Sequence, residues 1–188
     1  MTRWPLSAPT VEPVRWESLF EDLELQIEAA QAVDRGLEVA ELTRAERAKV
    51  TLVDRLRAVR GTPVVLQLGG GATVAGELVD VASQWVLVAD GARRTLVPTP
   101  AIVLIKGVGL HAAPDAGAVM RRLSLGHALR ARARDRVLVR VLAQGVEITG
   151  RMERVGADHV DLMVGCGDPR NGELWTVPFA SLQAVRSG

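Results

Sequence analysis

The chain has little of the chemistry that depends on cysteine, on tyrosine or on an excess of one charge. Its 188 residues include one cysteine, no tyrosine, and 23 lysine and arginine residues against 22 aspartate and glutamate residues. A lone cysteine excludes a disulfide framework and a cysteine-based zinc site, and it fits a reducing compartment. The near-zero net charge gives the whole chain no general affinity for nucleic acid or for an acidic membrane surface.

Long hydrophobic runs are also missing. The uncharged stretch 95–105 is far shorter than a bilayer span, and no basic-then-apolar signal opens the chain. We therefore expect a cytoplasmic protein without membrane contact. Hydrophobic residues make up 48% of the chain, which is enough to bury a core.

What the chain does contain is an internal repeat. One block begins near residue 64 and the other near residue 137. Matched positions in the two blocks lie 73 or 74 residues apart before a loop that is six residues longer in the second block, and 80 residues apart after it. Such self-similarity indicates two copies of one small β unit. The matched pairs include Leu66 with Val139, Leu68 with Val141, Gly76 with Gly150, Leu78 with Met152, Val86 with Val160, Val88 with Leu162 and Val97 with Val177.

Each repeat predicts about five strands. Residues 146–153 alternate between apolar and polar side chains, which is typical of a half-buried strand. Gly76 and Gly150 fall in the middle of a strand, where glycine favours a sharp bend that can close a small barrel.

The order of hydrophobic strand, glycine turn, Gly-x-Leu and a final Ile105-Lys106-Gly107 resembles the Sm-like and SH3-like small barrels. This resemblance implies two barrels in tandem. Sm proteins bind uridine-rich RNA through polar residues after the second strand, and those positions fall on Ala82, Val86, Gly156 and Val160. The resemblance therefore implies the fold without the Sm-type RNA site.

The segment 15–60 lacks proline and predicts a helical arm, either one rod or two helices broken near residues 34–36. Its first part is acidic and its second part is basic, so two such helices would complement each other when antiparallel. We expect either a coiled coil, formed as a hairpin or between two chains as a dimer, or an amphipathic helix lying on the barrels. The apolar seam of the arm would be Trp16, Phe20, Leu23 and Ile27.

The expected fold is α+β, with an N-terminal helical arm followed by two small Sm/SH3-like β-barrels joined by a helix. The expected parts are a disordered tail (1–14), the arm (15–60), a first barrel (61–110), a basic linker helix (111–136) and a second barrel (137–188).

Four stretches also resemble a group of actinobacterial proteins of unassigned role, some of which are labelled Fis-type transcriptional regulators. The stretches are residues 15–20, 52–57, 154–159 and 176–180. Fis-type proteins act through a C-terminal helix-turn-helix, whereas this chain ends in a strand-rich repeat. The resemblance therefore does not carry the Fis-type mechanism over to this chain.

Two surface features are candidates for function. Trp85 and Leu87 stand where the second repeat has His159 and Asp161, so the arm, the second barrel or another chain should cover them. The linker is rich in arginine, which would either grip phosphates or pair with the acidic arm. The arginines are Arg121, Arg122, Arg130, Arg132, Arg134 and Arg136.

No catalytic, cofactor-binding or metal-binding set is predicted. The three histidines have no i, i+4 pair, and no nucleophile elbow is present. We therefore expect a non-catalytic interaction module, an adaptor or scaffold that binds a protein partner or itself, with no small-molecule substrate. The alternative is a nucleic-acid-binding regulator that uses the arginine helix, with weak binding because no aromatic residue is interleaved for base stacking.

Overall fold

The computed structural model describes residues 41, 44, 47–113, 123–165 and 172–187. The chain divides into one unit at residues 1–49 and a second at residues 50–188, and the sheet lies in the second. Among the described residues, none of the helices has the length and apolar character needed to cross a membrane.

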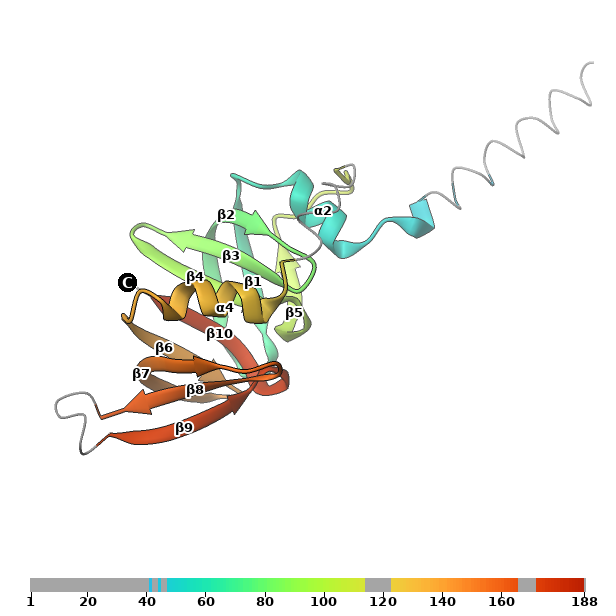
Figure 1. Ribbon diagram of the computed structural model, residues 1–188. Coiled ribbons are helices and arrows are strands. Elements are labelled where there is room, and N and C mark those ends of the chain that lie inside the picture. Colours follow the sequence, from blue (N-terminus) through green and yellow to red (C-terminus); the bar gives the residue numbers. More distant parts are fainter. Residues whose placement is uncertain (1–40, 42–43, 45–46, 114–122, 166–171, 188) are drawn as a thin grey trace, which may run out of the picture. The chain divides into compact units, whose positions relative to one another are not determined.

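The described residues of the second unit contain ten strands, two helices and three 3-10 turns (Figure 1). Its elements are α2 (Leu52–Ala58), β1 (Pro63–Leu68), η1 (Gly69–Gly71), β2 (Thr73–Val81), β3 (Trp85–Asp90), β4 (Arg93–Pro98), η2 (Thr99–Ala101), β5 (Ile102–Lys106), α4 (Leu125–Ala133), β6 (Leu138–Ala143), β7 (Val146–Val155), β8 (His159–Val164), β9 (Glu173–Pro178), η3 (Phe179–Ser181) and β10 (Leu182–Ser187).

All ten strands belong to one antiparallel sheet with the order β5-β1-β2-β3-β4-β10-β6-β7-β8-β9. The expectation of two closed small barrels joined by a helix is wrong, because the sheet is open and the two repeats are joined by strand pairing. In the described residues β5 does not pair with β4, nor β10 with β9; instead β4 pairs with β10. The backbone groups on the outer side of β4 and β10 therefore form hydrogen bonds with the other repeat, and neither strand closes a barrel within its own repeat.

The strand pairings recur along the chain. Val86 pairs with Val97 in the first repeat as Val160 pairs with Val177 in the second. A β-bulge interrupts β2 and β3 after Leu78, and another interrupts β7 and β8 after Met152. Bulges bend a strand and increase its twist, so both repeats curve at the same place.

The first strands align differently from the sequence match. Val64 pairs with Gly76, and Val139 pairs with Gly150. Val139 is therefore the counterpart of Val64 rather than of Leu66. The reason is the shorter hairpin turn of the second repeat, which leaves only two residues between β6 and β7.

Each repeat surrounds a hydrophobic core, and each core includes residues from the other repeat. Ala184 of β10 lies fully buried in the core of the first repeat. In the opposite direction, Ala82 and Trp85 belong to the core of the second repeat, together with Leu125 and Leu129 of α4. The two cores therefore depend on each other.

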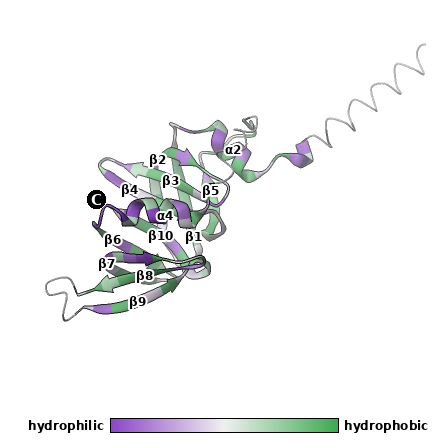
Figure 2. Cartoon of the chain, in the orientation of Figure 1, coloured by the Kyte–Doolittle hydropathy of each residue, from purple (hydrophilic) through white to green (hydrophobic). Residues whose placement is uncertain are grey.

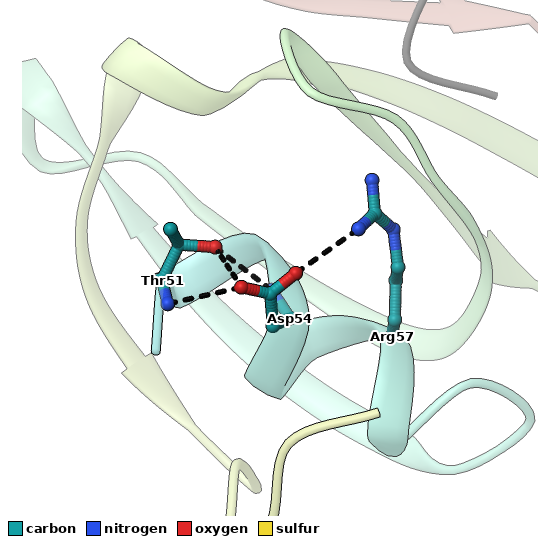
Figure 3. A network of polar contacts seen from close by, with 3 residues as sticks. All are labelled: Thr51, Asp54 and Arg57. Atoms are coloured by element: carbon teal, nitrogen blue, oxygen red, sulfur yellow. Dashed lines mark hydrogen bonds and ion pairs between the residues drawn. The ribbon is translucent and has the colours of Figure 1, made fainter. Parts of the chain in front are cut away.

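The described part of the arm does not form a coiled coil. Residues 47–49 are helical, the helix breaks at residues 50–51, and α2 follows with only seven residues. The break is set by a capping box: Asp54 N–H donates to Thr51 Oγ1 at 3.2 Å, and Thr51 N–H donates to an Asp54 carboxylate oxygen at 3.0 Å (Figure 3). Leu56 is fully buried in the first core, so α2 covers the sheet and the coiled-coil expectation is wrong.

Candidate functional site

The helix α4 is held to both repeats. Leu125 N–H donates to Oε1 of Gln84 at 2.9 Å, and Trp85 Nε1–H donates to the carbonyl of Leu123 at 3.1 Å. Ser124 caps the helix by accepting a hydrogen bond from His127 N–H. Figure 2 shows that hydrophilic and hydrophobic residues are mixed along α4, as expected of a helix with one packed side.

Trp85 is therefore covered within the chain. Its side chain is buried, and Leu87 is partly buried against the same core. An apolar cavity of about 250 Å³ remains beneath α4, between Leu87, Leu96 and Leu129. The apolar residues that distinguish the first repeat from the second are thus covered by the linker helix, a possibility that the sequence comparison did not include.

Two of the predicted arginines brace α4 against the second repeat. Arg130 donates to the carbonyl of Gly156 at 3.3 Å. Arg132 donates to Ser187 Oγ and forms an ion pair with Asp135 at 3.4 Å. These guanidinium groups therefore have structural partners.

Arg134 and Arg136 lie at the end of α4 and just beyond it. Both are exposed, and neither side chain has a hydrogen bond or ion pair in the part of the chain that the structure describes. Arg121 and Arg122 lie outside the described residues. The arm residues Trp16, Phe20, Leu23 and Ile27 also lie outside them.

The fold brings together a different set of arginines. Arg93, Arg140 and Arg186, which we call the arginine row, come from the adjacent strands β4, β6 and β10 and line one cleft of about 300 Å³. Arg186 lies directly opposite Arg140 in the ladder, where two like charges repel. Arg140 forms an ion pair with Glu147 at 3.0 Å. The arginine row thus makes the cleft at the joint of the repeats electropositive.

A larger groove of about 710 Å³ lies beside η2, η3 and the start of α4. Three of its polar side chains are already engaged inside the protein. Gln183 contacts the carbonyl of Gly69 and accepts from Gly145 N–H at 3.4 Å, while Gln84 and Arg130 hold α4 as described above. These three side chains therefore hold the protein together at the groove rather than point to a ligand.

The carboxyl group of Asp158 has a shifted pKa. His159 Nδ1 lies 2.8 Å from Oδ1 of Asp158. This side-chain hydrogen bond lowers the pKa of Asp158 below its ordinary value. Among the described residues no group of three or more histidine, cysteine or carboxylate side chains converges on a metal position.

The two ends of the sheet carry exposed apolar side chains. β5 is the strand at one end and exposes Val103 and Leu104. β9 is the strand at the other end and exposes Leu174 and Trp175. We call these strands the β5 edge and the β9 edge. An exposed apolar edge strand offers unpaired backbone groups and hydrophobic surface to another strand.

Sequence reasoning missed both edges and the arginine row. The edges depend on which strands lie at the ends of the sheet, and the arginine row depends on which strands are adjacent. Local sequence patterns predict neither. A comparison with protein-family models finds no match, and neither does a comparison with curated proteins.

Proposed function

We propose that the protein is a non-catalytic cytoplasmic interaction module whose sheet edges bind protein strands. The observation that carries this proposal is the pair of exposed apolar edges, with Val103 and Leu104 at one end and Leu174 and Trp175 at the other. Strand addition supplies main-chain hydrogen bonds for affinity and side-chain packing for specificity. It requires no catalytic group and no cofactor.

Site-specific photo-crosslinking in living cells tests this proposal. A benzophenone amino acid is placed at Leu104, at Trp175 or, as a control, at Leu110, which is exposed but lies beyond β5. We expect protein adducts from the two edge positions and few from position 110. Equal adduct yields at all three positions, or no adducts from the edges, would contradict the proposal.

A second candidate function is binding of a nucleic-acid backbone, favoured by the arginine row. Arg93 and Arg186 line the same cleft, and two guanidinium groups in one cleft favour the binding of an anion there. Such binding would be weak and independent of base sequence, because phosphate contacts carry no base readout.

Fluorescence anisotropy with duplex DNA and single-stranded RNA over a salt series tests the second candidate. The double variant Arg93→Gln/Arg186→Gln should weaken binding. It should also reduce the slope of log affinity against log salt concentration by about two, since each lost phosphate contact reduces that slope by about one. Arg134→Gln/Arg136→Gln removes the same charge elsewhere and serves as the control. Equal effects of the two double variants would count against the arginine row.

A further inference from the structure

The joint between the repeats shows how these edges can be covered. β4 and β9 are equivalent strands, because Val97 and Val177 hold the same position in the two ladders. β5 and β10 are equivalent as well: Ile105 pairs with Leu66 in β1, and Val185 pairs with Val141 in β6. Inside the chain β4 pairs with β10. Their counterparts, β9 and β5, are the two ends of the sheet.

Burial separates the joined strands from the free ones. Gln183 and Ala184 in β10 are 7% and 0% exposed, whereas their counterparts Val103 and Leu104 in β5 are 64% and 63% exposed. On the other side of the joint, Thr95 in β4 is 8% exposed, whereas its counterpart Trp175 in β9 is 49% exposed. The free strands thus expose apolar side chains at positions that are buried in their counterparts.

We infer that the partner at these edges is a second copy of the chain, joined head to tail. The β9 edge of one copy pairs with the β5 edge of the next and repeats the β4·β10 joint between molecules. This inference rests on the proposed edge-binding function and names its partner. Because the two edges differ, the contact is heterologous, and it extends into a chain of copies or closes into a ring.

The internal joint also defines the register. Val185 pairs with Leu96, Arg186 with Thr95 and Ser187 with Arg94. The equivalent intermolecular pairs are Ile105 with Thr176, Lys106 with Trp175 and Gly107 with Leu174.

The side chains suit this register. Lys106 comes to lie opposite Trp175, whose Nε1–H donates to Glu173 at 3.1 Å, so the ammonium meets an aromatic face and a nearby carboxylate. Leu174 comes to lie opposite Gly107, where no side chain obstructs it. Leu104 takes the place that Ala184 holds in the internal joint, and it would bury its apolar surface against the neighbouring copy.

Analytical ultracentrifugation of the full chain tests the contact. The average mass should rise above the monomer's 20.2 kDa as the concentration increases. Leu104→Lys blocks the β5 edge and Trp175→Lys blocks the β9 edge, and both replace exposed side chains, so the fold is retained. Each variant should sediment as a monomer. Leu110→Lys makes the same change at an exposed apolar residue outside the strands and should assemble like the wild type.

A mixture of the two blocked variants tests the polarity of the contact. Leu104→Lys retains a working β9 edge and Trp175→Lys retains a working β5 edge, so an equimolar mixture should form a one-to-one dimer that grows no further. A mixture that stays monomeric overturns the inference. So does wild-type assembly that either edge variant leaves intact, or a wild type that is monomeric at every concentration.

The crosslinking experiment separates failure of this inference from failure of the proposed function. Edge adducts only with other proteins, together with a monomeric chain, would overturn the head-to-tail contact and leave the interaction module in place. A monomeric chain without edge adducts would overturn both.

Discussion

Two glycines lie where the carbonyl of a neighbouring strand leaves no room for a side chain. A Cβ atom at Gly150 would lie 2.6 Å from the carbonyl oxygen of Met163, and one at Gly76 would lie 2.1 Å from that of Ala89. Gly150→Ala should therefore lower the free energy of unfolding by roughly 1–3 kcal/mol through overpacking. Gly109→Ala is the control, because nothing lies near its Cβ position. Equal urea midpoints for the two variants would contradict the close approach.

Gln183 is the polar residue that ties the turns of the two repeats together. It is buried, contacts the carbonyl of Gly69 and accepts a hydrogen bond from Gly145 N–H. Gln183→Met keeps the shape but leaves both backbone groups without this partner, which should cost about 1–3 kcal/mol of unfolding free energy. Gln67→Met makes the same change at an exposed position of β1 and should be nearly neutral in the same denaturation experiment.

At the scale of elements, α4 forms part of the second core. Leu129 is 1% exposed and packs with Trp85 and the strands of the second repeat. Leu129→Ala should lower the unfolding free energy by about 2–5 kcal/mol, because it removes buried methyl groups and leaves a cavity. Leu110→Ala deletes the same atoms at an exposed site and should change the thermal midpoint little. Similar losses in the two variants would mean that α4 does not cover this core.

At the scale of the whole molecule, the shared strand joint should make the two repeats unfold as one unit. Ala184 belongs to the second repeat in sequence and to the first core in space. Ala184→Asp buries an unpaired carboxylate there and should reduce hydrogen-exchange protection in β1 and β7 alike. Protection lost in β1 alone would show that the repeats open independently.

The individual elements could be predicted more fully than their assembly. Alternation around Ile148 and the mid-strand Gly150 indicated a bent strand, and β7 runs through both. The end of the arm was harder to predict, since the lack of proline in residues 15–60 favoured a continuous helix, whereas a capping box at Thr51 starts a new one. Whether curved strands close or stay open depends on which neighbour offers the better pairing, and here β10 occupies the outer side of β4.

The candidate sites were predictable only in part. The asymmetry at Trp85 indicated a covered surface, and α4 covers it with Leu125 and Leu129. The arginine-rich linker was visible as composition, yet two of its guanidinium groups serve to dock the helix. The arginine row was invisible, because Arg93 and Arg186 lie far apart in the chain and meet only across the joint.

The sequence by itself determined the repeat and the strand periodicity, because a repeat shows in the order of the residues and the periodicity depends on neighbours within one strand. Only the tertiary structure decided that the repeats share one sheet, that Trp85 lies beneath α4, and that Leu104 and Trp175 are exposed at its two ends. The physical reason is that strand pairing and side-chain packing join residues far apart in the chain: β4 pairs with β10, α4 packs on Trp85, and the open sheet leaves β5 and β9 at its ends.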